Sequence, residues 1–365
     1  MSEQPADSEL TVAQLGEFGL ISRLARLVNG GVRDPLQPEA SGSLGIGDDA
    51  ALWTPRPGYR EVLTTDALIE NVHFRHTTTS WHDLGWKMLA ENVSDIAAMG
   101  AAPTRAFVTL GLRPDTRVTD LDNLYRGMAE HAEAFGLSIA GGDTVSSPVT
   151  MLSVTVVGEL EGEGLRRAAG QSGDLLAVTG TLGGSAGGLT LLEQGDVPHV
   201  NPDVAVLVGL HRRPMPRVAE GLHLAAAGGR CGMDLSDGLF GDAGKLAYAS
   251  GLQAVLRPDM LPIPPALARR FGEDSARQMA LTGGEDYELL VAGEAETLAA
   301  ASIMLREHGL MPLTIVGRLE AGPAGQVTVE DKNGNPLAPP RSSWDHFRQQ
   351  DASPAASAEG RDAPA

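Results

Sequence analysis

The sequence predicts an α/β or α+β fold built from two domains. Its 365 residues exceed the usual size of one domain, and both halves alternate strand-like and helix-like segments. A stretch rich in glycine and charge, Glu161–Gly173, separates the halves. We therefore predict an N-terminal domain at 10–162 and a C-terminal domain at 163–347, with disordered ends at 1–9 and 348–365.

The first half alternates predicted helices and strands. Apolar residues at helical spacing predict a surface helix over Thr11–Asn29, which Gly30 and Gly31 would end. The same criteria give, in chain order, a strand at Glu61–Asp66, a helix at Trp81–Met99, a strand at Ala106–Leu112, a helix at Asp120–Phe135 and strands at Ser138–Ala140 and Thr150–Leu160. We read 141–144 as a turn after a strand, where glycine would let the backbone approach a phosphate.

One face of the predicted helix at Trp81–Met99 carries charge. Lys87, Glu91 and Asp95 fall at positions i, i+4 and i+8, so their side chains share one side of the helix. This pattern fits a solvated helix face, and it equally fits a rigid element that projects Asp95 into a functional site. The spacing alone does not choose between the two interpretations.

The second half contains a further alternation. The predicted elements are a strand at Asp174–Thr179, a helix that ends near Gly195, a helix that begins within Arg213–Arg217, a strand at Arg230–Asp234, a helix at Leu239–Ser250, a strand at Tyr287–Ala292, a helix at Glu294–His308 and a strand at Leu313–Leu319. The glycine-rich loop at 180–188 is a weak phosphate-binding signal, since tight packing between helix and strand explains it equally well.

Charge restricts the class of partner. The formal net charge is -19, and the chain has no basic stripe or Lys/Arg-rich tail that could displace counterions. We therefore expect neither nucleic acid nor an anionic membrane as a partner. A phosphate substrate would have to be bound mainly by metal ions and backbone N–H groups.

Cysteine content and hydropathy indicate the compartment. Cys231 is the single cysteine, so no internal disulfide can form, and its apolar surroundings predict a packed thiol rather than a nucleophile. The start of the chain is acidic and polar, and no apolar run reaches 18 residues. We expect a cytoplasmic protein.

Acidic turns recur along the chain and predict metal binding. The first is Gly45–Leu52, which contains two adjacent carboxylates, and Thr64-Thr65-Asp66 follows at the end of a predicted strand. Similar turns stand at Asn92–Asp95, Gly141–Thr144, Asp234–Gly238 and Gly283–Asp286. If they converge, carboxylates about 4 Å apart repel by several kcal/mol per pair unless cations neutralise them. All the ligands offered are hard oxygens, which favours Mg²⁺, Mn²⁺ or Ca²⁺ over zinc. Because Mg²⁺ is commonly shared between carboxylates and substrate phosphates, nucleotide chemistry is the leading prediction.

Better-known motifs fit the sequence poorly. Gly45–Ala50 matches a loose dinucleotide fingerprint, but Asp48 and Asp49 would repel a pyrophosphate, and prolines interrupt the helix that should follow. Gly244-Lys245 lacks the rest of a Walker A loop. No G-x-S-x-G elbow occurs, so covalent hydrolysis is poorly supported.

Metal-assisted phosphoryl transfer is the reaction class that fits the acidic turns and the lack of a nucleophile motif. It requires positioning and charge neutralisation rather than protein nucleophiles. If the acceptor is itself a phosphate, it is mostly ionised at neutral pH, so no catalytic general base is expected. Two polyanions must then be brought together, and we expect several Mg²⁺ ions.

Seven motifs, in order and with preserved spacing over roughly residues 16–347, together resemble the thiamine-monophosphate kinases. They are Gly45–Ala50, Thr64-Thr65-Asp66 with His73-Phe74, Asn92–Gly100, Gly141–Thr144, Asp234–Leu239, Gly283–Leu289 and Trp344–Phe347. The resemblance implies phosphorylation of thiamine monophosphate to thiamine diphosphate by ATP with Mg²⁺. It also implies the fold of aminoimidazole ribonucleotide synthetase, with N-terminal sheets that pair into a barrel in a homodimer.

The resemblance also implies roles for individual residues. The metal ligands would be Asp49, Thr64, Thr65, Asp66, Asp95, Asp143, Asp234 and Asp237. The residues that contact ATP would be Gly142, Asp143, Arg167 and Ser236. The thiamine monophosphate site would be lined by His73, Glu285 and Trp344. The tryptophan would suit stacking on a cationic ring, and the glutamate would suit hydrogen bonds to the pyrimidine.

Two positions depart from the family pattern, and two rival functions stay open. Asn71 replaces a usual glycine, and Arg167-Ala168-Ala169-Gly170 replaces the usual Arg-x-Gly-Ala, which leaves Arg166 and Arg167 as alternatives for ATP contact. One rival is another ATP-dependent enzyme of the same fold. A selenophosphate synthetase would normally carry a cysteine or selenocysteine near its N-terminus, where this chain has none. The other rival is a non-catalytic Mg-nucleotide-binding protein.

Overall fold

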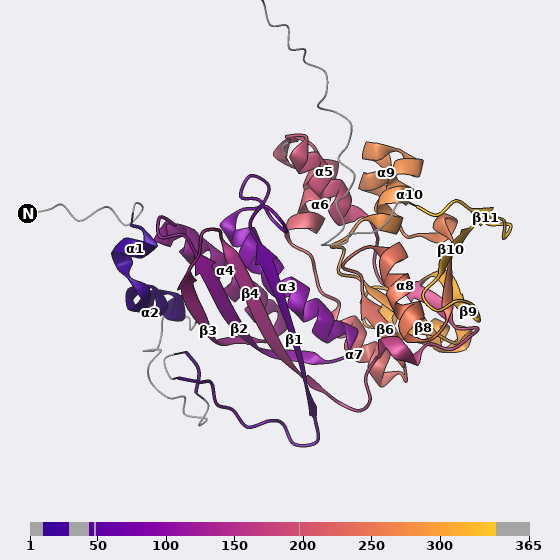
Figure 1. Ribbon diagram of the computed structural model, residues 1–365. Coiled ribbons are helices and arrows are strands. Elements are labelled where there is room, and N and C mark those ends of the chain that lie inside the picture. Colours follow the sequence, from indigo (N-terminus) through magenta and orange to yellow (C-terminus); the bar gives the residue numbers. More distant parts are fainter. Residues whose placement is uncertain (1–9, 29–43, 47–48, 197, 341–365) are drawn as a thin grey trace, which may run out of the picture.

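The computed structural model describes residues 10–28, 44–46, 49–196 and 198–340. The predicted disorder of 1–9 and 348–365, the helix stop at Gly30-Gly31 and the role of Trp344 lie outside these residues. The described chain forms two sheets of different size, which lie side by side with their helices (Figure 1). We call the parts that carry them the N-terminal half, up to residue 160, and the C-terminal half, from residue 175. The predicted domain bounds stay a prediction.

The N-terminal half contains a four-stranded sheet covered by helices on one face (Figure 1). Its strand order is β1-β4-β2-β3, and only β2 and β3 run parallel. The elements are α1 (Val12–Leu15), α2 (Glu17–Val28), β1 (Arg60–Ile69), α3 (Trp81–Ala98), β2 (Ala102–Leu112), α4 (Val118–Phe135), β3 (Ser138–Ser146) and β4 (Met151–Leu160). Residues Ala106, Val108 and Leu110 of β2 face the helices and are buried in the core.

The second face of this sheet carries exposed apolar side chains. Leu63 is 67% exposed and Val145 is 44% exposed. Trp53, from the segment before β1, lies over part of this face, with its ring 6.2 Å from that of Phe107. The face that α3 and α4 do not cover is therefore partly apolar; we call it the open face.

The C-terminal half contains a mixed seven-stranded sheet of order β11-β10-β7-β9-β5-β8-β6. Its strands are β5 (Leu175–Val178), β6 (Cys231–Asp234), β7 (Gln253–Leu256), β8 (Leu289–Gly293), β9 (Thr314–Glu320), β10 (Val327–Glu330) and β11 (Pro336–Leu337). Its helices are α5 (Gly184–Glu193), α6 (Pro202–Arg212), α7 (Val218–Ala226), α8 (Leu239–Ala249), α9 (Pro265–Phe271), α10 (Glu273–Thr282) and α11 (Ala295–Glu307).

Most predicted elements are confirmed, with two corrections and several omissions. Residues 141–144 do not form a turn, because they continue β3, where Gly142 pairs with Val108 of β2. The first helix is divided at Gly16 into α1 and α2. The sequence interpretation missed α6, α9, α10 and the strands β7, β10 and β11. All three of these strands are four residues or fewer, too short for a periodic pattern to identify.

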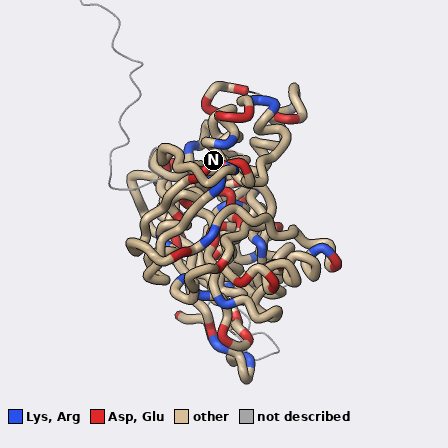
Figure 2. The backbone as a smooth tube through the Cα atoms, turned by 90° about the vertical axis from the view of Figure 1, so that its right-hand side faces the viewer, with Lys and Arg blue, Asp and Glu red and all other residues tan. Residues whose placement is uncertain are grey.

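Basic and acidic residues alternate over the molecule. Figure 2 shows Lys and Arg interspersed with Asp and Glu along the described chain. Several form close ion pairs, such as Arg318 with Glu330 at 2.6 Å and Arg217 with Glu288 at 2.6 Å. No helix in the described ranges is long and apolar enough to cross a membrane.

Cys231 at the start of β6 confirms the prediction of a packed thiol. It is 1% exposed, and burial, followed by the charge of Asp174, raises the pKa of the thiol to about 11. A thiol with such a pKa is almost fully protonated at neutral pH, so it is a poor nucleophile.

Two glycines allow α3 and α4 to pack closely. A Cβ on Gly85 would lie 1.9 Å from the carbonyl oxygen of Leu124, and one on Gly127 would lie 1.9 Å from that of His82. Each glycine thus faces the backbone of the other helix. This contact fixes the position of α3, which also carries the charged face described below.

We expect Gly127→Ala to destabilise the protein by about 1–3 kcal/mol or more, because the new methyl group must push α3 and α4 apart. The matched control is Gly209→Ala in α6, where a Cβ would meet nothing within 4 Å. That substitution should be neutral or stabilise by about 0.5–1 kcal/mol, since alanine favours helix. Urea unfolding measures both, and equal stability of the two variants would contradict the packing argument.

His131 of α4 is buried among aromatic rings. It stacks on Phe135 with ring centroids 4.5 Å apart and meets Trp86 edge to face. Neither ring nitrogen has a hydrogen-bond partner within the described part of the chain. Burial, and then the charge of Arg213, lowers the pKa of His131 to about 3. The neutral imidazole is therefore the form that the fold accepts.

His131 makes folding sensitive to acid. Between its folded pKa of about 3 and an unfolded value near 6.5, only the unfolded chain binds the proton, so this contribution to stability falls as pH decreases. Between pH 8 and pH 5, we expect the free energy of unfolding of His131→Leu to decrease by about 2 kcal/mol less than that of the unsubstituted chain. Leu124→Ala, which adds a cavity but no titratable group, should keep the original pH dependence. Equal pH dependence in all three proteins would contradict the assignment.

Candidate active site

The charged face of α3 is buried between the two halves. The helix begins after Ser80, whose hydroxyl accepts the Asp83 N–H at 3.1 Å as an N-cap. Further along, Lys87 is 1% exposed and Glu91 is 8% exposed. The interpretation of a solvated helix face is therefore wrong, because this face packs against the C-terminal half rather than against water.

The helix brings Asp95 to the middle of β1, which continues to Ile69 and so does not end at Asp66 as predicted. The Thr64 hydroxyl donates a hydrogen bond of 2.5 Å to the Asp95 carboxylate. Side chains alternate along a strand, so Asp66 lies on the same face of β1 as Thr64. Partial desolvation, followed by the charge of Asp95, raises the pKa of the Asp66 carboxyl to about 6. Two carboxylates of the N-terminal half thus lie close enough to repel each other.

Asp234 joins these residues from the C-terminal half. It ends β6 and is 3% exposed, and the Ser94 hydroxyl of α3 donates to its carboxylate at 2.9 Å. Burial, and then the charges of Asp95 and Asp242, raises the pKa of Asp234 to about 8. Asp95 therefore stands between Asp66 and Asp234, and we call these three residues the acidic cluster. As the side chains stand, no three His, Cys, Asp or Glu residues in the described ranges are arranged to hold one metal ion.

Two other predicted ligands lie on the opposite face of the first sheet. Thr65 points away from α3, since its hydroxyl donates to the Val154 carbonyl and accepts from Thr155. Asp143 lies on β3, where it pairs with Thr109 of β2. In the sheet, β3 is separated from β1 by β4 and β2. Three strand spacings amount to about 14 Å. Within one chain, neither residue meets the acidic cluster, and their roles as ligands stay predictions.

Asp237 also stands outside the acidic cluster. Asp49 is exposed beside residues that the structure does not describe. Asp237 forms an ion pair with Lys245, whose ammonium also lies 2.7 Å from Asp242. Asp242, which sequence reasoning missed, is fully buried and accepts the N–H groups of Ser236 and Asp237. Its position in the first turn of the helix after Gly238 could have identified it, because a carboxylate there can accept free backbone N–H groups.

The two acidic turns of the C-terminal half are bonded to each other. The Glu285 N–H donates to the Ser236 carbonyl at 2.8 Å, and the Tyr287 N–H donates to that of Leu235 at 2.9 Å. Glu285 and Tyr287 have φ angles of 65° and 52°, which are uncommon for residues other than glycine. This turn, 283–287, presents Glu285 toward α3.

Lys87 of α3 meets Glu285 across the junction of the halves. Its Nζ lies 2.9 Å from the Glu285 carboxylate, and Nδ1 of His211 lies 3.4 Å from the same oxygen. Sequence reasoning did not assign Lys87 to the site. Its spacing of eight residues from Asp95 on one helix face was the available signal.

His73 lies in the turn that follows β1. Its Nδ1 accepts the Ile69 N–H at 3.1 Å, which orients the ring. Asn71 in this turn has a φ angle of 66°. This explains why glycine suits the position, and asparagine tolerates the left-handed conformation better than most residues.

The two candidate arginines have different neighbours. Arg166 forms an ion pair with Glu163 at the surface. Arg167 acts on Asp234, since its charge lowers the pKa of that carboxyl. The carbonyl of Arg167 also accepts the Ser250 hydroxyl at 2.8 Å, which fixes its backbone. Arg167 is thus the arginine that faces the acidic cluster.

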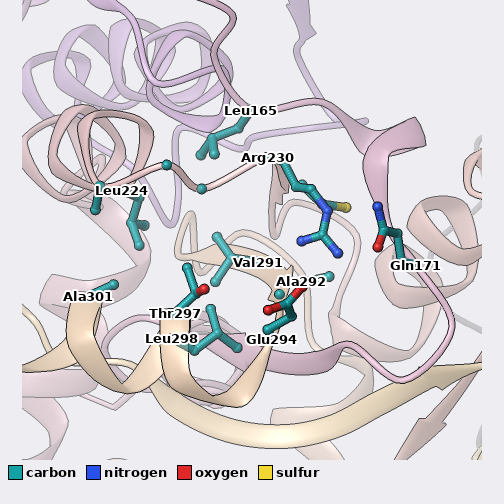
Figure 3. Close-up of a pocket in the computed structure, with 15 residues that line it drawn as sticks. Leu165, Gln171, Leu224, Arg230, Val291, Ala292, Glu294, Thr297, Leu298 and Ala301 are labelled. Carbon is teal, nitrogen blue, oxygen red and sulfur yellow. The ribbon is translucent and has the colours of Figure 1, made fainter.

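A separate cavity of about 260 Å³ lies at the other end of β6 (Figure 3). Arg230 and Glu294 stand at one end of it, and Leu224 and Ala301 at the other. The first residue of β6 lines this cavity, whereas Asp234 is the last residue of the strand. The cavity is therefore distinct from the acidic cluster.

Both halves match family models. Residues 47–160 match "AIR synthase related protein, N-terminal domain", and residues 171–330 match "AIR synthase related protein, C-terminal domain". Fold and site thus define a two-domain protein of the AIR synthase related class. Both matched regions contribute to the acidic cluster: Asp66 and Asp95 belong to the first and Asp234 to the second.

Curated relatives narrow the class. A thiamine-monophosphate kinase of Bacillus subtilis (strain 168) is 34% identical over 85% of this chain and 95% of its own. The thiamine-monophosphate kinase of Escherichia coli (strain K12) is also 34% identical, over 91% of this chain and 98% of its own. The chain belongs to the thiamine-monophosphate kinase family.

Solved structures support the same family. Thiamine-monophosphate kinase from Stenotrophomonas maltophilia K279a is 37% identical, with a TM-score of 0.74 over 88% of this chain and 98% of that one. A structure described as "AaThiL complexed with AMPPCP and TMP" is 30% identical, with a TM-score of 0.70 over 93% and 99%. The hydrogenase maturation protein HypE of E. coli, at 19% identity and a TM-score of 0.67, shares the fold alone.

Proposed function

We propose that this chain transfers the γ-phosphoryl group of ATP to thiamine monophosphate, giving thiamine diphosphate and ADP in a Mg²⁺-dependent reaction. The acidic cluster carries the proposal, because Asp66, Asp95 and Asp234 converge from both halves of the molecule. The related structure described with AMPPCP and TMP supports the choice of both substrates.

The donor groups fit Mg²⁺. Carboxylates of the acidic cluster and the Thr64 hydroxyl are hard oxygen ligands, which this ion prefers. When bound, Mg²⁺ supplies the positive charge that lets two phosphate groups approach. Ser94 holds Asp234 in place, while Thr64 holds Asp95. The remaining metal ligands of the proposal are Asp49, Thr65, Asp143 and Asp237, of which the last three lie outside the cluster in a single chain.

The nucleotide would be bound by Gly142, Asp143, Arg167 and Ser236. Arg167 is favoured over Arg166 because it faces Asp234, whereas Arg166 is paired with Glu163. A guanidinium suits phosphate because its N–H groups match two oxygens at once. The acceptor would be bound by His73 and Glu285, with Trp344 from outside the described residues.

The proposal includes the assembly and location of the protein. We propose a homodimer formed through the open face, since exposed apolar residues such as Leu63 and Val145 are typical of interfaces. A barrel of two sheets would also cover the edge strands β1 and β3. We further propose two domains at 10–162 and 163–347 and a cytoplasmic location, which the single buried thiol of Cys231 supports.

The proposed reaction is tested by incubating the chain with Mg·ATP and thiamine monophosphate. We expect thiamine diphosphate and ADP in equal amounts by chromatography, and no product when EDTA removes the metal. ATP binding without turnover would favour a non-catalytic nucleotide-binding protein. Turnover of ATP without thiamine diphosphate would favour another ATP-dependent enzyme of this fold.

We expect Asp66→Asn to lower turnover by about 100-fold or more, in the range seen for groups that stabilise transition-state charge. The amide has the same shape as the carboxylate, so the thermal transition should change little. The control is Asp115→Asn, an 81% exposed carboxylate of the same half that should keep full activity. Full activity of Asp66→Asn would refute its role.

Arg167→Ala should raise the KM for ATP by about tenfold or more, the loss expected for one charge-assisted contact. Arg166→Ala serves as its matched neighbour and should leave this KM within about twofold, because exposed ion pairs contribute little. Steady-state kinetics with ATP as the varied substrate decides the question. The reverse order of effects would assign the contact to Arg166.

A further inference from the structure

Lys87 is a buried lysine at the junction of the two halves. The residue is 1% exposed, although lysine is among the residues least often buried without a partner. Its partner is Glu285, 2.9 Å away and 198 positions later in the chain. The ion pair therefore joins α3 of the N-terminal half to the turn 283–287 of the C-terminal half.

The other groups around this ion pair leave Lys87 as the cation that neutralises Glu285. Glu91 lies one helical turn from Lys87, and burial raises its pKa to about 8, so it is mostly uncharged at neutral pH. The Tyr287 side chain acts in the opposite direction and lowers the pKa of Glu91. Burial, and then the charge of Lys87, lowers the pKa of His211 to about 2, so its imidazole is neutral. Its Nδ1 also lies 3.0 Å from the Ser185 hydroxyl.

The two side-chain contacts of Glu285 fall on one of its two carboxylate oxygens. Lys87 and His211 both approach Oε2. The side chain as a whole keeps 28% of its surface exposed. The backbone is fixed in a left-handed conformation by the N–H bond to Ser236. Lys87 thus holds one side of the carboxylate while the other side can accept a ligand.

We propose that Lys87 is a positioning residue for the phosphoryl acceptor: it orients the Glu285 carboxylate from across the junction so that the free oxygen accepts an N–H of the amino group on the substrate's pyrimidine. This inference rests on the proposed function. It adds that affinity for the acceptor depends on α3, an element that itself need not touch that ring. Phosphoryl transfer and ATP binding depend on the acidic cluster instead.

The test is Lys87→Met, which keeps an unbranched side chain and removes the charge. We expect the KM for thiamine monophosphate to rise about tenfold or more, as for the loss of one hydrogen bond to a charged group. The KM for ATP and kcat should change less than about threefold. A similar rise in both KM values would indicate a merely structural role and would overturn the inference.

A double-mutant cycle separates positioning from direct action. If Lys87 acts through Glu285, then Lys87→Met should have no further effect on the acceptor KM in a Glu285→Gln background. Independent effects that multiply would overturn the inference. If Lys87→Met does not fold, Lys87→Gln replaces it, with the same expected results.

The control is Arg23→Met, which breaks another partly buried ion pair, with Asp122 at 2.7 Å, in the same half. It should leave the acceptor KM unchanged. Calorimetric binding of thiamine monophosphate in the presence of AMPPCP gives a readout without turnover. Unchanged binding by Lys87→Met, with normal binding by the unsubstituted chain, overturns this inference alone. Failure of the unsubstituted chain to bind thiamine monophosphate overturns the proposed function as well.

Discussion

The structure depends on a charged helix face buried between two halves. Charged side chains are costly to remove from water unless each is paired or hydrogen-bonded. On α3, Lys87 is paired with Glu285, Ser94 donates to Asp234 and Asp95 accepts from Thr64. These contacts connect β1, β6 and the turn 283–287 through one helix. The close packing of α3 on α4 then holds this helix in place.

Neighbouring carboxylates are balanced in two different ways. Asp237 and Asp242 share the ammonium of Lys245, so their charge is neutralised within the C-terminal half. Asp95 and Asp234 are instead held by hydroxyl groups, which fix an oxygen without supplying a charge. The second arrangement supplies no cation, and the pKa values of Asp66 and Asp234 are raised accordingly. A divalent cation would favour the ionised carboxylates, which is why the proposed function places the metal at the acidic cluster rather than at the other acidic turns.

Fold and family carry different amounts of functional information. The hydrogenase maturation protein HypE shares this fold at low identity, so the arrangement of sheets and helices is compatible with more than one reaction. The kinase relatives match over most of the chain at 34% identity, so the family assignment rests on more than the arrangement of sheets and helices. Specificity for the acceptor would then be decided by a few contacts, among them the one between the buried Lys87 and Glu285.

The sequence by itself determined the class of fold, the hard-oxygen character of the ligands and the family, because periodicity, residue type and motif order are local properties. Only the tertiary structure decided that Asp66, Asp95 and Asp234 meet while Asp143 lies across the sheet. Strand order and register set those distances, and they follow from pairing between segments far apart in the chain. For the same reason Lys87 was recognised only in the fold: its helix spacing fitted water or protein equally well, and the C-terminal half covers it.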